Sequence, residues 1–352
     1  MAYSRGQKFL FGCLGCFGGI VVLVVVVLSL FVHWVKTPGI PLEGSRLYDA
    51  ATAVYAEVHL RSEDPGAREF VRVFLNAARN PPIPDNAKVP VPMTMILGNL
   101  PRREATDAEL DKILPLVLVM RRQAGPGGEA AAPMLGLSLS PAGNSLRILH
   151  AMFNFIAWRG KKIEKEVRGD QDIFRVNAES RGQEVPVWVS FVGTDALLAR
   201  DGDAVRAGVD TLAAAPAGAP SPLAALRPEQ ACIFLVAKPG YAGAALDTIA
   251  ELLPGVADTL RPVVKGGSGL TVWGTLKSAD ILEGEVHLTG AAPGTVPAAA
   301  DLSGKATLMI GPTPLDVSFE PLVAGAAPSP GWKLRVAGLE AAARARLLHV
   351  DR

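Results

Sequence analysis

The chain has 352 residues, enough for one large domain or two of ordinary size. Arg5 and Lys8 are the only charged residues among the first 35, so the remainder carries 33 basic against 34 acidic side chains, a net charge of −1. A balance of this kind produces no long-range field that would gather a polyanion, which argues against a nucleic-acid partner. The abundance of Ala, Gly, Pro and Arg is typical of a GC-rich bacterial genome.

The N-terminal part is dominated by an uncharged stretch over residues 9–35, with His33 as its one ionisable side chain apart from the cysteines. As a helix it would span about 40 Å, more than the ~30 Å hydrocarbon core of a bilayer requires. We therefore predict a transmembrane signal-anchor helix over 9–35, a cytoplasmic segment over 1–8 and a tether over 36–44. The cations before the helix favour an N-terminus inside and a domain outside the cytoplasm, which in a bacterium is the periplasmic side of the inner membrane.

Two alternatives to an anchor are a cleaved signal peptide and a lipoprotein. The apolar stretch is about twice as long as a signal-peptide core, and residues 31–35 offer no pair of small residues for cleavage. Cys13 lies in a lipoprotein-like context, but the apolar stretch follows this cysteine instead of preceding it. Both alternatives are therefore less favoured than the anchor.

Small residues gather on one face of the predicted membrane helix: Gly12, Gly15, Cys16 and Gly19. Small residues four apart allow two membrane helices to approach closely, so this face could form a homodimer through the membrane. A glycine-rich helix without a partner is the simpler interpretation. Cys13 and Cys16 also spell C-x-x-C, but the βαβ context of a redox site is missing, and Cys232 alone cannot form a disulfide within the remaining chain.

Alternating and helical hydrophobic patterns divide the rest of the chain. Asp64 and Pro65 supply an N-cap and a first-turn proline, so a helix should follow the first strand. Strands are expected near 53–60, 116–120, 134–139, 163–168, 172–178, 185–192, 195–200, 232–237, 270–276, 281–288, 307–310, 315–319 and 332–336, and helices near 65–79, 105–114, 145–158, 203–212, from 241 and from 339.

The Ala/Pro-rich segment 215–228 is typical of a linker, and the order of elements before it partly recurs after it. We predict an α+β fold with two related units, 45–214 and 229–352, each an antiparallel sheet with helices packed on one face. Whether they form two cores or one joint sheet is left open by the pattern.

The run from Val187 to Leu212, together with Val54 to Leu75, resembles a strand–turn–strand–helix unit of uncharacterised, membrane-anchored bacterial envelope proteins of unknown function. The resemblance covers about 60 residues. It implies an envelope location and brings no catalytic residue, cofactor or ligand.

A repeated tetrapeptide gives the sharpest candidate for chemistry: Glu57 and His59 recur as Glu285 and His287. Residues two apart on a strand share a face, so each pair sets a carboxylate beside an imidazole. If the two strands were neighbours, the four side chains could bind Zn²⁺ or a similar ion. The simpler interpretation places both pairs on solvent-exposed strand faces, with no metal and no cofactor.

Other polar motifs are weaker. His150, with Ser145 and Asn154, is expected on the polar face of its helix, and the glycine-rich run 266–269 has the spacing of neither a nucleophile elbow nor a phosphate loop. The favoured interpretation is a non-enzymatic envelope protein whose domain binds an unknown protein partner or acts as a scaffold. A lipid-binding cavity between sheet and helices and a metal-dependent hydrolase are the alternatives.

Overall fold

The fold is taken from a computed structural model of the chain. It describes residues 44–79, 104–125, 129–138, 145–160, 163–180, 183–192, 195–215, 222–252, 257, 260, 261, 264, 268–290, 304–310, 313–322 and 331–341. The predicted segments 1–8 and 9–35, nearly all of the tether 36–44 and the residues Gly12, Gly15, Cys16 and Gly19 lie outside these ranges. Within them, no helix is both long and apolar enough to cross a bilayer.

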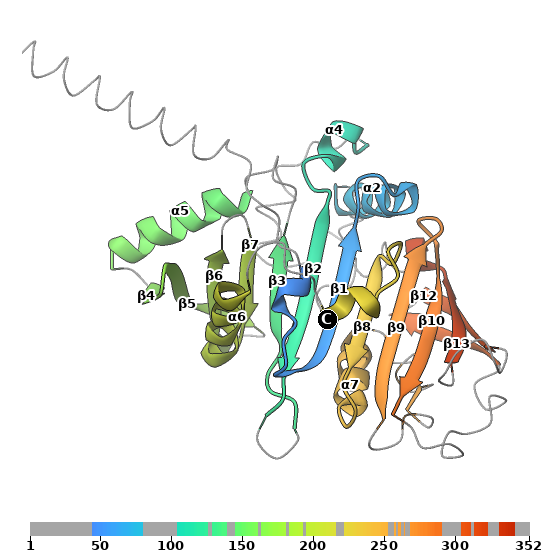
Figure 1. The fold of residues 1–352 in the computed structure, drawn as a ribbon. Coiled ribbons are helices and arrows are strands. Elements are labelled where there is room, and N and C mark those ends of the chain that lie inside the picture. Colours follow the sequence, from blue (N-terminus) through green and yellow to red (C-terminus); the bar gives the residue numbers. More distant parts are fainter. Residues whose placement is uncertain are drawn as a thin grey trace, which may run out of the picture.

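A single antiparallel sheet of 13 strands organises the chain, in the order β11-β12-β13-β10-β9-β8-β1-β2-β3-β7-β6-β5-β4 (Figure 1). The prediction of an α+β fold with antiparallel strands is therefore confirmed, and the two parts of the chain share one sheet. The strands are β1 Thr52–Leu60, β2 Leu116–Gln123, β3 Met134–Ser138, β4 Ile163–Arg168, β5 Gln171–Ser180, β6 Gln183–Val192, β7 Asp195–Ala199, β8 Ile233–Ala237, β9 Gly269–Leu276, β10 Ile281–Thr289, β11 Gly304–Ile310, β12 Thr313–Pro321 and β13 Gly331–Ala337.

The two parts of the chain meet at the middle of this sheet, where β1 pairs with β8. The register runs from Val54 opposite Ala237 to Val58 opposite Ile233. Outward from β1 lie β2, β3, β7, β6, β5 and β4, all from the first part, and outward from β8 lie β9, β10, β13, β12 and β11, all from the second. Among the described strands, the β1–β8 pair is therefore the one hydrogen-bonded junction between the strands of the first part and those of the second.

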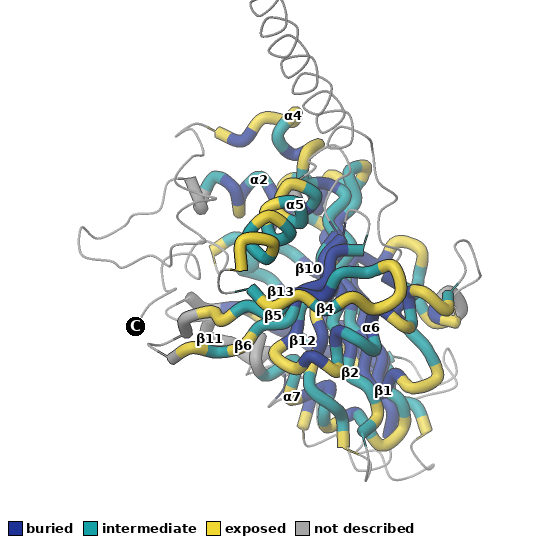
Figure 2. Tube along the Cα trace, turned by 90° about the vertical axis from the view of Figure 1, so that its left-hand side faces the viewer, coloured by how far each residue is buried: buried dark blue, intermediate teal, exposed yellow. Residues whose placement is uncertain are grey.

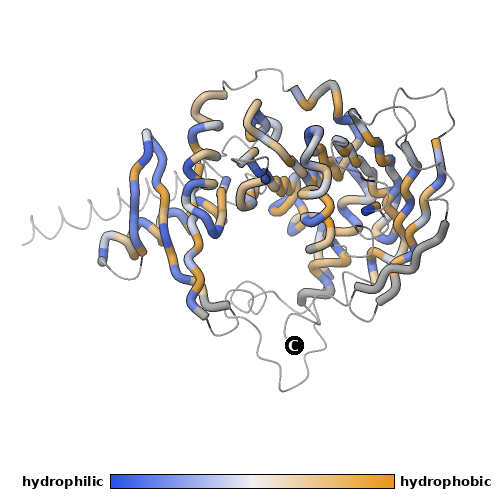
Figure 3. Tube along the Cα trace, turned by 90° about the horizontal axis from the view of Figure 1, so that it is seen from below, coloured by the Kyte–Doolittle hydropathy of each residue, from blue (hydrophilic) through white to orange (hydrophobic). Residues whose placement is uncertain are grey.

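Successive side chains along each strand point to opposite faces of the sheet, and hydrophobic and hydrophilic segments alternate along some of the strands in Figure 3. Val54 on β1 contributes to the core under α2 (Pro65–Arg79) and α7 (Ala242–Leu252). Tyr55, its neighbour, points to the opposite face and belongs to the core under α6 (Gly202–Ala214).

The prediction that the helices pack on one face is wrong, because α6 lies on the face opposite α2 and α7. Val205, Val209 and Leu212 of α6 pack into the same core as Met134 of β3 and Leu197 of β7. Met134 is 2% exposed and Leu197 0%, so the first part of the sheet is covered on both sides.

Helix α5 (Ser145–Trp158) has the predicted bounds but presents a different face to the sheet. The apolar spacing of this helix predicts an inward face of Leu149, Met152, Phe153 and Ile156. Phe153 does enter the core, together with Leu146, whereas Leu149 and Met152 are 39% and 53% exposed. The reason is His150, whose ring stacks on Phe191 with 5.0 Å between centroids and so lies toward the core. Shorter helical segments among the described residues include η1 (Gly44–Leu47), α4 (Asp107–Leu110) and η4 (Pro222–Ala225).

Gly208 allows α6 to approach the sheet closely, since a Cβ at this position would lie 2.2 Å from Met134 Sδ and 3.2 Å from Leu197 Cδ1. We predict that Gly208→Val lowers the free energy of unfolding by about 1–3 kcal/mol through overpacking. Gly243→Ala in α7 is the matched control, because a Cβ there meets nothing within 4 Å. Urea denaturation followed by circular dichroism measures both, and equal midpoints for Gly208→Val and the parent chain would contradict the packing described.

Candidate binding face on the second part of the sheet

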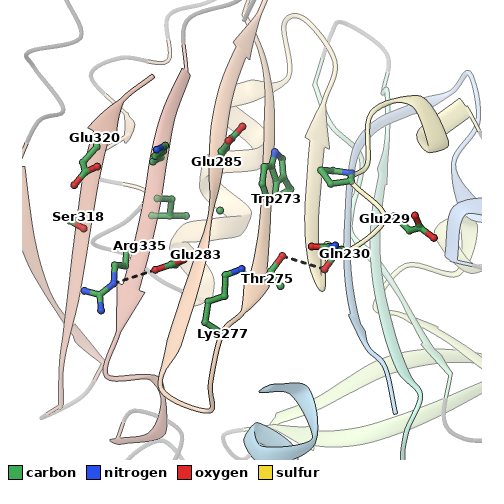
Figure 4. Close-up of a pocket in the computed structure, with 14 residues that line it drawn as sticks. Glu229, Gln230, Trp273, Thr275, Lys277, Glu283, Glu285, Ser318, Glu320 and Arg335 are labelled. Atoms are coloured by element: carbon green, nitrogen blue, oxygen red, sulfur yellow. Dashed lines mark hydrogen bonds and ion pairs between the residues drawn. The ribbon is translucent and has the colours of Figure 1, made fainter. Parts of the chain in front are cut away.

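The face of β9, β10, β13 and β12 that continues the α6 side carries no helix among the described residues, and it is polar. Strand pairing places its side chains in rows across the sheet. One row runs Thr275, Glu283, Arg335 and Ser318, and the next runs Trp273, Glu285, Lys333 and Glu320. Figure 4 labels all of these side chains except Lys333 and shows them projecting from neighbouring strands. The strands thus build a continuous polar surface.

This surface is hollowed, with a volume of about 670 Å³. The lining combines one indole, four carboxylates, three cations and several small polar groups. It consists of Pro228, Glu229, Gln230, Trp273, Thr275, Lys277, Glu283, Gly284, Glu285, Ser318, Glu320, Lys333, Leu334 and Arg335. None of these lining residues is a histidine or cysteine.

The charges of the hollow are only partly used inside the molecule. Arg335 Nε lies 3.7 Å from Glu283 Oε1, an exposed and therefore weak pair. Lys277, Lys333 and Glu320 are exposed and make no ion pair with another described residue. Both signs of charge remain available to a ligand or partner.

Two glycines allow the strands beneath the hollow to approach closely. Gly284 of β10 lies opposite Gly274 of β9, and a Cβ on Gly284 would lie 1.9 Å from the carbonyl oxygen of Trp273. Any side chain at this position would push β9 and β10 apart. The glycine therefore keeps Trp273 and Glu285 in adjacent places on the surface.

Glu57 is buried, and its expected place on a solvent-exposed strand face is wrong. Its side chain is 2% exposed and accepts hydrogen bonds from Tyr55 Oη and Arg227 Nη1, both at 2.6 Å. Arg227 Nη2 also lies 3.3 Å from Nδ1 of His59, which is 3.7 Å from Glu57. These contacts hold residues just after η4 against the middle strand of the sheet.

Burial decides the ionisation around Glu57. It lowers the pKa of His59, and the nearby Arg227 cation lowers it further against the opposing influence of Glu57. Burial also raises the pKa of Tyr55 well above its usual value, with Glu57 adding to the rise. The cluster thus consists of a neutral imidazole, a neutral phenol and one buried ion pair.

The second copy of the tetrapeptide lies elsewhere on the same face. His287 Nε2 is 2.8 Å from Glu285 Oε2, and Gly331 leaves room for the imidazole because a Cβ there would lie 2.8 Å from His287 Nδ1. Strands β8 and β9 separate this pair from Glu57 and His59. Three strand spacings of about 4.8 Å put the pairs roughly 14 Å apart, too far for one metal ion.

The structure places each glutamate beside its own histidine, as the sequence predicts. It does not bring the two pairs together. The described residues contain no group of three or more metal-binding side chains. His150, expected at the surface, is half-buried against Phe191 and lies 3.4 Å from Asp172. Arg227 was not singled out, because it falls in the predicted linker and its partner is 170 residues away.

Comparisons with known proteins identify no relative. No protein-family model matches the chain. Neither a curated protein nor a solved structure gives a significant match.

Removing Arg227 should be far more costly than removing an exposed arginine. Arg227→Leu leaves Glu57 buried without its counter-charge, so we predict a loss of about 3–5 kcal/mol in the free energy of unfolding. Arg261→Leu, which breaks an exposed pair with Asp247, is the matched control and should change stability by less than about 1 kcal/mol. Urea denaturation compares the two, and similar losses would show that the Glu57 pair does not hold the linker.

The lowered pKa of His59 predicts a loss of stability toward acid. The unfolded chain binds the His59 proton more readily than the folded one, so folding is favoured above the unfolded pKa of about 6.5 and stability falls as the pH drops below it. His59→Gln should therefore show a smaller decrease in urea midpoint between pH 7.5 and 5.5 than the parent chain. His287→Gln serves as the comparison, and an identical pH dependence for parent and His59→Gln would refute the assignment.

Proposed function

We propose that the chain is a non-enzymatic, single-pass protein of the bacterial inner membrane whose extracytoplasmic domain binds a protein partner on the hollow of β9, β10, β13 and β12. The anchor is the uncharged stretch 9–35, with the cations of residues 1–8 on the cytoplasmic side. A homodimer through Gly12, Gly15, Cys16 and Gly19 belongs to the same proposal.

The observation that supports partner binding is the contrast between the two parts of one sheet face. In the first part, α6 covers apolar residues such as Met134 and Leu197. In the second part the same face carries Trp273, Lys333 and Arg335 in a hollow that no described element covers. Tryptophan and arginine are the residue types most often found at energetic centres of protein interfaces.

The mixed charge of the hollow favours a protein segment over other ligands. Four carboxylates beside three cations would repel a polyanion as much as attract it. A protein segment with both signs of charge can satisfy them pairwise, with the indole as a central apolar contact. The hollow does not support the lipid-binding alternative, because it lies on a polar face of the sheet rather than between the sheet and the helices. The hydrolase alternative would need the two glutamate–histidine pairs to converge.

The finer description of the fold belongs to this proposal too. We propose that residues 45–214 and 229–352 are related units joined through 215–228. The support is the outward order of strands from β1 and from β8, together with a helix after each central strand: α2 follows β1 and α7 follows β8.

Site-directed photocrosslinking in native membranes tests the binding face. With p-benzoylphenylalanine in place of Lys333, we expect a covalent adduct with another protein, identified by mass spectrometry. The same reagent in place of Glu164, an exposed residue of β4, is the control and should capture at least several-fold less. Adding Arg335→Glu to the chain with the photoreactive residue at position 333 should lower the yield of the protein adduct several-fold, because it reverses one charge of the hollow.

Two results would refute the proposal. One is an adduct found only within the chain, between position 333 and residues 342–352, which would mean that the chain covers its own hollow. The other is equal capture at positions 333 and 164.

A further inference from the structure

Helix α5 exposes an apolar surface that no described element covers. Ile148, Met152 and Phe155, spaced by four and three residues, are 44%, 53% and 53% exposed. Leu149 is 39% exposed and Trp158, at the end of the helix, 81%. Figure 2 shows exposed residues along α5. Because residues three and four apart share one helix face, Ile148, Met152 and Phe155 form a stripe.

This stripe is distinct from the face with which α5 packs on the sheet. Leu146 and Phe153 enter a core with Phe174, Val189 and Phe191. The helix is therefore apolar on two sides, one of which meets the protein. Soluble proteins rarely leave such a surface in water unless something binds it.

The charged side chains of the segment 145–162 are all basic, and the acidic Asp172 of β5 lies 3.4 Å from His150 on the side of α5 that faces the sheet. Residues 145–162 contain Arg147, Arg159, Lys161 and Lys162 and no acidic side chain. The Arg159 guanidinium lies over the Phe155 ring, 5.1 Å from its centroid, so a cation accompanies the apolar stripe. A helix with Trp, Phe and Leu facing outward beside Arg and Lys has the composition of helices that lie in the interface of an anionic membrane.

We propose that α5 lies against the anionic surface of the bilayer that holds residues 9–35, with Ile148, Met152, Phe155 and Trp158 entering the headgroup region. The inference rests on the proposed anchor. A tether of nine residues, 36–44, spans at most about 30 Å and keeps the domain close to that bilayer. The hollow of the second part lies on the opposite side of the sheet from α5, so this contact leaves it open to a partner.

Photocrosslinking of the full chain in liposomes tests the contact. With p-benzoylphenylalanine in place of Phe155, irradiation should attach phospholipid to the chain, detected as a mass increase on the peptide that contains position 155. The yield should be at least several-fold higher with phosphatidylglycerol present than with phosphatidylcholine alone. The matched control replaces Arg175 of β5, whose side chain is 40% exposed, and should give no lipid adduct.

Equal lipid yields at positions 155 and 175, or a chain-to-chain adduct as the main product at position 155, would overturn the inference, the latter in favour of a second copy as the occupant. Carbonate extraction of the same liposomes separates this failure from a failure of the proposed function. A chain that stays in the membrane but gives no lipid adduct at position 155 refutes the α5 contact alone. A chain released by carbonate refutes the anchor and the α5 contact together.

Discussion

The pairing of β1 with β8 is the interaction on which the rest of the structure depends. Among the described strands, only this pair joins the first part to the second, from Val54 opposite Ala237 to Val58 opposite Ile233. Both faces of the pair are buried, one under α2 and α7, the other beside α6 and the Arg227–Glu57 ion pair. Apolar burial on two sides, with one desolvated ion pair across the linker, makes this strand pair the common support of both parts.

From that support the two parts diverge in how they treat one face of the sheet. The first part places Met134, Ile173 and Leu197 on the face and covers them with α6. The second part places Trp273, Glu285 and Lys333 on the same face. An apolar sheet face needs a cover in water, whereas a polar one does not. The residue types on alternate strand positions therefore decide which part is enclosed and which can bind.

Features set by neighbours in sequence could be predicted. The bounds of α5 and the start of α2 follow from apolar spacing and from Asp64, which accepts hydrogen bonds from the backbone amides of Gly66 and Ala67. The buried side of α5 could not be predicted, because most positions of this helix are apolar and no single face stands out in the sequence. The side that packs inward depends on the stacking of His150 on Phe191, which is a tertiary contact. The contact of Arg227 with Glu57 spans 170 residues, and no local pattern signals it. The strands that form the hollow show the same alternation of apolar and polar residues as any strand with one solvent-exposed face. The hollow therefore has no distinct signal in the sequence.

The central position of the β1–β8 pair has a consequence for biosynthesis. Most other strand pairs close short or moderate loops, but Val58 and Ile233 are 175 positions apart along the chain. Loop-closure entropy delays such pairings, and a ribosome delivers β1 long before β8. During synthesis the edge of β1 that pairs with β8 has no partner until residues 233–237 arrive. In that interval the edge is a template for any extended strand, including β8 of a neighbouring nascent chain, so crowding of nascent chains would favour strand-exchanged dimers over monomers.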